Sequence, residues 1–155
     1  MITVLLLSIS RLHCQVIEYD DILLNCDTAY TTLEYRFCAS YKLYQSIAKY
    51  DSIISKINTC LDLLIIQDSV SRQKALEEDS TISFENWTDY KKIKEIFTES
   101  DSLFILFVTN ESSILGELYG NGQERSIAEN GRMQELYDHR IKDLIEFCNI
   151  NCDIE

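Results

Sequence analysis

Apolar residues recur at helical spacing along most of the chain. At about 100° per residue, the apolar positions between residues 19 and 48 fall on one narrow stripe. The stripe consists of Tyr19, Leu23, Cys26, Tyr30, Leu33, Phe37, Tyr41, Tyr44 and Ala48. This pattern predicts one long amphipathic helix that buries the stripe in the core. Tyr35 and Tyr50 lie outside the stripe, so we expect them at the surface as contact residues for another protein.

The periodicity predicts a second helix after a break at residues 50–52, where Asp51 or Ser52 is a suitable N-cap. Its apolar positions are Ile53, Ile54, Ile57, Leu61, Leu64 and Ile65. Residues 67–83 are polar and are expected to form a short helix or a connection. Ser83 is then a suitable cap for a third helix over residues 84–97.

A fourth helix is expected from Asp101 or Ser102 to Tyr119. The run Leu103 to Val108 alone also suits a buried strand, but the helical period continues to Tyr119, which favours a helix. Gly120-Asn121-Gly122 is expected to end it, because glycine supplies left-handed backbone positions. Asn130-Gly131 suggests another turn before a last helix over residues 133–148. The predicted fold class is all-α, a disulfide-stabilised bundle of about five helices.

The composition supports this fold class. The chain has 155 residues, no proline and only four glycines. A chain so poor in residues that break helices and form turns favours long helices over many short strands. Its length suits one domain, which we place at residues 15–155.

The first residues resemble a secretory leader. Ile2 to Leu7 are uninterrupted apolar, and Ile9 extends the run. This run is too short to span a bilayer but fits the apolar region of a signal peptide. Residues 1–10 are therefore the expected signal peptide, with a cut after Cys14 as the alternative. A buried N-terminal element of a cytoplasmic protein is the competing interpretation.

Six cysteines accompany this leader, which favours disulfides in an oxidising compartment. The candidates are Cys14, Cys26, Cys38, Cys60, Cys148 and Cys152. If Cys26 and Cys38 shared one continuous helix, they would lie about 18 Å apart along its axis, too far for a bond. A turn near Tyr50 would instead bring Cys38 level with Cys60, so Cys38–Cys60 is the best predicted pair. All six pair only if Cys14 is retained; otherwise the odd cysteine is free or links two copies into a dimer.

The charge narrows the range of partners. The formal net charge is −12, which repels phosphate backbones and anionic lipid surfaces. We therefore expect no nucleic-acid partner. After the first residues, no apolar run approaches the length of a transmembrane helix, so we also expect no membrane insertion of the mature chain. Two Asn-x-Ser/Thr sequons, at Asn86 and Asn110, are candidate glycosylation sites on a secreted chain.

Sequence motifs for catalysis or cofactor binding are absent. There is no phosphate-binding glycine loop, no G-x-S-x-G, no H-E-x-x-H and no calcium loop. His139 with Cys148 and Cys152 has spacing untypical of zinc sites, so no catalytic residue, cofactor or metal is assigned. The leading hypothesis is a secreted helical protein that binds another protein. The alternatives are a carrier of apolar small molecules between helices, suggested by the aromatic-rich run 103–107, and an intracellular adaptor with reduced cysteines.

Overall fold

The structure is a computed structural model and describes residues 26–152. A short 3-10 helix, η2 (Cys26–Thr28), precedes three α-helices: α1 (Thr32–Glu78), α2 (Tyr90–Tyr119) and α3 (Arg125–Asn151). No strand occurs within residues 26–152. The all-α prediction is confirmed, but the expectation of about five helices is wrong, because the described range holds three α-helices.

The predicted break at residues 50–52 does not exist. α1 is one helix of 47 residues, so its axis is about 70 Å long. Asp51 and Ser52 lie exposed in its interior rather than at a cap. Leu43, Tyr50 and Ile57 are spaced seven residues apart and are all buried. Residues spaced seven apart lie on the same side of a helix, so this side can pack against the neighbouring helices along its length. These contacts on both sides of Asp51 and Ser52 hold the helix together through the two polar residues.

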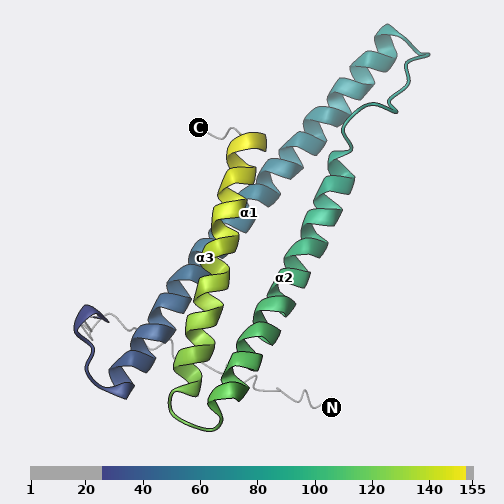
Figure 1. The fold of residues 1–155 in the computed structure, drawn as a ribbon. Helices are drawn as coiled ribbons and strands as arrows, with labels where there is room; N and C mark the ends of the chain where they lie inside the picture. The colour runs from purple at the N-terminus through teal and green to yellow at the C-terminus, as the bar shows by residue number, and fades with distance from the viewer. Residues whose placement is uncertain (1–25, 153–155) are drawn as a thin grey trace, which may run out of the picture.

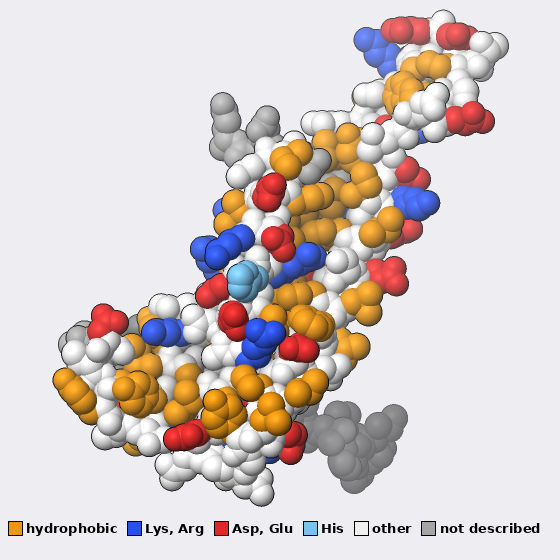
Figure 2. Space-filling model, viewed as in Figure 1, with side chains coloured by type: hydrophobic (Ala, Val, Ile, Leu, Met, Phe, Trp, Pro, Cys, Tyr) orange, Lys and Arg blue, Asp and Glu red, His pale blue; other side chains and the backbone are white. Residues whose placement is uncertain are grey.

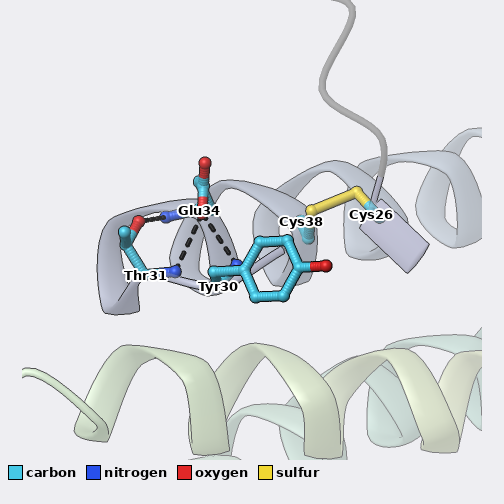
Figure 3. The surroundings of a disulfide bond; sticks show 5 residues. All are labelled: Cys26, Tyr30, Thr31, Glu34 and Cys38. Atoms are coloured by element: carbon cyan, nitrogen blue, oxygen red, sulfur yellow. Dashed lines mark hydrogen bonds between the residues drawn. A yellow bond between two sulfur atoms is a disulfide. The ribbon is translucent and has the colours of Figure 1, made fainter. Parts of the chain in front are cut away.

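α1 begins at Thr32, later than the pattern predicted. Thr31 and Glu34 form a capping box, in which the Thr31 hydroxyl accepts from the Glu34 backbone N–H at 3.2 Å. The Glu34 carboxylate accepts from the backbone N–H groups of Thr31 and Tyr30, both at 2.8 Å, as Figure 3 shows. These hydrogen bonds lower the pKa of Glu34. A reciprocal cap satisfies backbone donors that a helix start leaves unpaired, so it fixes where α1 begins.

α2 merges the third and fourth predicted helices. It begins at Tyr90, capped by the Asp89 side chain, which accepts from the Lys92 backbone N–H at 3.0 Å. The predicted caps at Ser83 and at Asp101 or Ser102 are therefore wrong. The helix chosen over a strand for residues 103–108 is confirmed, as is the end at Gly120, where φ is +63°.

α3 starts at Arg125 and runs through Asn130-Gly131, so the predicted turn there is wrong. Near its start α3 lies very close to α2. A Cβ built on Gly116 of α2 would fall 1.9 Å from the Glu129 carboxylate of α3. A side chain at position 116 would have to displace the end of the flexible Glu129 side chain.

α3 occupies the middle of the arrangement and packs against both other helices, which contact each other less. Figure 1 shows α2 antiparallel to α1 and α3, and α1 extending past the C-terminal end of α3. The buried hydrophobic cluster contains Leu43, Tyr50, Ile57, Leu61, Val108, Tyr137, Ile141 and Leu144. Of the residues described, none belongs to a helix long and apolar enough to cross a membrane.

Polar contacts between helices surround this core. Ser46 of α1 donates to Asp138 of α3 at 2.7 Å. Lys94 of α2 pairs with Asp62 of α1 at 2.5 Å. These contacts are partly exposed and individually contribute little stability, but they favour one register between the helices.

The disulfides differ from the predicted pairing. Cys26 bonds to Cys38, and Cys60 bonds to Cys152, whereas Cys38–Cys60 was expected. Cys26 is not part of α1: it lies in η2, and the chain reverses before Thr32, so the Cα atoms of Cys26 and Cys38 are 5.6 Å apart. Cys38 and Cys60 share one straight helix, 22 residues apart, and are separated by about 33 Å along it.

The second bridge joins the end of α3 to the middle of α1. Cys60 and Cys152 are only 5% and 6% exposed. Cys148 is the one unbonded cysteine among residues 26–152. Cys14, and with it the question of a third pair, lies outside the described residues.

The continuity of α1 is testable by replacing Ser52 with proline. Proline inside a helix removes a hydrogen bond and clashes with the preceding turn, at a cost of about 3 kcal/mol or more. We expect Ser52→Pro to lower the free energy of unfolding by at least that much in urea titrations of the oxidised protein. Ser52→Ala, which keeps the backbone N–H, is the matched control and should change it by less than about 0.5 kcal/mol. Equal stability of the two variants would show a break at this position.

The bridges should differ in their contribution to stability. The Cys60–Cys152 bond closes a loop with a separation of 92 residues and the Cys26–Cys38 bond one of 12 residues. In the chain-entropy account, replacing the first pair by serine costs about 4–5 kcal/mol and the second about 3 kcal/mol. Urea unfolding of the two double-serine variants measures this difference. Peptide mapping without reduction checks the pairing itself, and a peptide joining Cys38 to Cys60 would contradict the fold.

Candidate functional site

The first half of α1 carries aromatic and apolar residues on two opposite faces. One face, with Leu43 and Tyr50, is buried in the core. The other is exposed and consists of Tyr30 (85% exposed) just before the helix, Leu33 (59%), Phe37 (39%), Tyr41 (52%) and Tyr44 (70%). We call this exposed set the aromatic face of α1. The sequence prediction that this stripe is buried is therefore wrong.

The second half of α1 determines which face of the first half is buried. Ile57 and Leu61 pack in the core. Because α1 is one continuous helix, the residues that share their direction must also face α3. At about 100° per residue, Leu43 lies about 40° from Ile57 around the axis, whereas Phe37 lies about 160° away. The longer apolar stripe therefore points away from the bundle.

Tyr50 is a core residue, contrary to the expectation that it contacts another protein. It is 2% exposed, and its ring lies 5.4 Å from that of Phe104 and 5.0 Å from that of Tyr137, measured between centroids. Its hydroxyl donates a hydrogen bond to Asp101. Burial, this hydrogen bond and the negative charge of Asp101 raise the pKa of Tyr50, so its phenol stays protonated.

Tyr35 is exposed, as expected, and belongs to the first turn of α1. Figure 2 shows hydrophobic side chains on the visible surface over this end of the molecule, and a second series along the edge formed by α2. Tyrosine and phenylalanine give large contact area for little conformational entropy, which is why they are enriched in protein interfaces. The aromatic face of α1 is therefore suited to contact a protein surface.

The start of α1 is held by two independent constraints. The capping box fixes its first turn, and the Cys26–Cys38 bond ties the preceding η2 to its second turn, as seen in Figure 3. Arg36 donates to Ser126 of α3 at 3.0 Å from the same region. Side chains on a restrained backbone lose less freedom when they bind, so this arrangement favours binding.

α2 carries the second exposed apolar surface, which we call the α2 stripe. It consists of Leu103, Leu106, Phe107, Ile114 and Leu118, which are 48–77% exposed. The run 103–107, which suggested a ligand cavity between helices, is therefore largely on the outside. Only Phe104 of that run packs against the core cluster.

Two open grooves lie among the described residues, and most of the residues that line them are polar or charged, although apolar atoms form much of the surface of the first. One, of about 590 Å³, lies between α1 and α2 and is lined by Ile65, Lys91, Lys94, Glu95, Thr98, Glu99 and Ser102. The other, of about 450 Å³, is lined by Leu64, Gln67, Asp68, Ser71, Asn86, Trp87, Thr88 and Tyr90. Sites for apolar ligands are usually concave and lined by hydrophobic side chains, so neither groove favours a carrier function.

Both sequon asparagines are exposed, Asn86 in the connection between α1 and α2, and Asn110 on α2. No sequon falls on α1. His139 is exposed on α3, and Cys152, its possible partner in a metal site, is in a disulfide. In the range that the structure covers, no three His, Cys, Asp or Glu side chains gather closely enough to hold a metal ion.

Two sequence signals would have located the aromatic face. Thr31-Thr32-Leu33-Glu34 is a capping-box signature that marks the start of α1 after Cys26. The spacing of seven between Leu43, Tyr50 and Ile57 marks a heptad seam that continues into the second half of α1. Together they assign the exposed side of the helix.

Comparison of the chain with profiles of protein families, with curated proteins and with solved structures finds no match.

The assignment of the two faces predicts opposite effects for two tyrosines of one helix. Tyr50→Ala should destabilise the protein by about 3–5 kcal/mol, because it opens a cavity in the core and leaves Asp101 without its hydrogen-bond donor. Tyr44→Ala should change the free energy of unfolding by less than about 0.5 kcal/mol. Chemical denaturation of the two variants measures both. A large loss of stability in Tyr44→Ala together with a small loss in Tyr50→Ala would mean that the buried and exposed faces of α1 are the reverse of those described.

Proposed function

We propose that this chain is an extracellular protein that acts without catalysis, by binding another protein through the aromatic face of α1. The observation that carries the proposal is the exposure of five large side chains on one side of the start of α1, opposite the core. Scattered exposed apolar residues are ordinary, but a contiguous group that the fold leaves on the surface marks an interaction site.

The extracellular location is supported by two features. One disulfide fastens η2 to α1, and the other fastens the end of α3 to α1. Bonds of this kind persist in oxidising compartments and are rare in the cytosol. The apolar run at residues 2–9, expected to be a leader that is cut after residue 10 or after Cys14, is consistent with this route.

A binding function agrees with the distribution of charge. The net charge of −12 disfavours nucleic acid and anionic membranes as partners and leaves a protein surface as the expected one. Binding through tyrosine side chains needs no cofactor, metal or catalytic group. The two alternatives, a carrier of apolar molecules and an intracellular adaptor with reduced thiols, are favoured by no specific contact in the fold.

The test is to purify the full chain from the medium of a secreting eukaryotic host and screen it against an array of extracellular protein domains. Tyr41→Ala/Tyr44→Ala is the informative variant. Loss of two aromatic side chains at the centre of an interface typically costs 2 kcal/mol or more, so we expect its Kd to rise about 30-fold or more. Biolayer interferometry measures the affinity.

Ile66→Ala/Val70→Ala is the matched control, because these side chains are exposed on the same helix but outside the aromatic face. It should bind as the unmodified protein does. Equal losses for the two double variants would argue against the aromatic face as the site. Retention of the protein inside cells with free thiols would reject the extracellular part and favour the adaptor.

A further inference from the structure

Asn110 lies in the middle of the α2 stripe. Residues three and four positions apart are neighbours on a helix surface. Asn110 therefore has Leu106, Phe107 and Ile114 beside it, and these are 57%, 48% and 61% exposed. Three of its four nearest neighbours on the helix surface are thus exposed apolar side chains. Asn110 itself is exposed and is the asparagine of a sequon.

The direction of helical side chains places a substituent on Asn110 over part of this stripe. Side chains in an α-helix lean toward the N-terminus and cover the preceding turn. A group attached to the Asn110 amide would therefore lie over Leu106 and Phe107 rather than project straight into water. The apolar faces of sugar rings pack well on such side chains.

We infer that Asn110 carries an N-linked glycan whose first sugars lie over Leu106 and Phe107 and cover the α2 stripe. This inference rests on the proposed function, because it requires passage through the secretory pathway. A second copy of the chain is the other occupant to consider. It would bring two chains of net charge −12 together, which opposes pairing, whereas a glycan carries no such penalty.

The modification is a transfer without oxidation or reduction. The Asn110 side-chain nitrogen bonds to the anomeric carbon of an oligosaccharide carried on a lipid diphosphate. The bond from that carbon to the diphosphate oxygen breaks, and the lipid diphosphate leaves with the electron pair. The amide nitrogen loses one proton. The host transferase and its lipid-linked donor supply the second substrate.

The third sequon residue restricts when the transfer takes place. Ser112 is only 2% exposed, and its hydroxyl donates to the Thr109 carbonyl oxygen at 3.0 Å. A transferase must reach this hydroxyl together with Asn110, so the glycan is added before α2 folds. Protein folded first and then exposed to the transferase would be modified at Asn86, in the connection, but not at Asn110.

The glycan would make the two exposed apolar surfaces differ in accessibility. A glycan at Asn110 shields the α2 stripe and keeps it from associating with other proteins. The aromatic face of α1, which has no sequon, stays accessible. The glycan thus directs binding to one side of the molecule.

The experiment expresses the full chain in a secreting eukaryotic host, once with its own N-terminus and once behind a leader of known efficiency. Glycopeptide mapping gives the occupancy of each sequon. We expect Asn110→Gln to remove the mass of one glycan and Asn86→Gln to serve as the matched control. Light scattering and binding of a hydrophobic dye then report exposure of the stripe. Both signals should rise in Asn110→Gln, stay unchanged in Asn86→Gln, and fall again when Leu106→Ala/Phe107→Ala is added to Asn110→Gln.

Each outcome decides the inference. Occupied Asn110 together with the dye and scattering pattern above supports it. An unoccupied Asn110 in protein recovered from the medium overturns it and leaves the proposed function intact. If Asn110 is occupied but Asn110→Gln changes neither dye binding nor light scattering, the glycan does not cover the α2 stripe, and that part of the inference is overturned. Failure of the chain to leave the cell with its own N-terminus, while the version with the added leader is glycosylated at Asn110, rejects the proposed location. It then overturns the glycan on the natural protein as well, although Asn110 can accept one.

Discussion

The continuity of α1 is the constraint on which the rest of the structure depends. A single helix of 47 residues can present only one side to its neighbours along its whole length. Ile57 and Leu61, in its middle, pack on α3, and this places Leu43 and Tyr50 inward. The aromatic residues between Tyr30 and Tyr44 are consequently outside. The binding surface that we propose is thus a product of rigid geometry rather than of a local excess of apolar residues.

The disulfides and caps support this geometry at its two weak points. The start of a helix frays unless its free backbone groups are satisfied, and the capping box of Thr31 and Glu34 together with the Cys26–Cys38 bond holds that end. The end of α3 lies beside the middle of α1, and the Cys60–Cys152 bond fastens it there. The chain therefore keeps its aromatic face on a restrained scaffold, which suits the binding function that we propose.

The sequence predicted the class of fold but not its arrangement. Low proline and glycine content and the 3.6-residue period were sufficient for an all-α chain, and Gly120 marked the end of α2 correctly. The predicted boundaries at Asp51 and Asp101 were misplaced, because a polar residue with capping ability is also tolerated inside a helix that tertiary contacts hold. The predicted cap at Ser83 lies in the connection before Tyr90 instead. The disulfide pairing depended on these boundaries and failed with them.

The error over the aromatic face has a different cause. Periodicity shows that a helix has an apolar side but not which of two apolar sides meets the core. In residues 30–50 both sides are apolar, and the contacts that bury Tyr50 but not Tyr44 come from α2 and α3, which are distant in sequence. Burial of Tyr50 by Phe104 and Tyr137 is such a long-range effect. Asn86, Asn110 and Tyr35, by contrast, are exposed as predicted.

Mass-spectrometric mapping of tyrosine nitration in the native, oxidised protein tests the central claim most directly, because each tyrosine reports its own exposure. The structure predicts rapid modification of Tyr30, Tyr41 and Tyr44, and protection of Tyr50 and Tyr137 until the protein unfolds. Rapid modification of Tyr50 with protection of Tyr41 and Tyr44 would mean that α1 buries its other side, and would contradict both the fold and the function proposed from it.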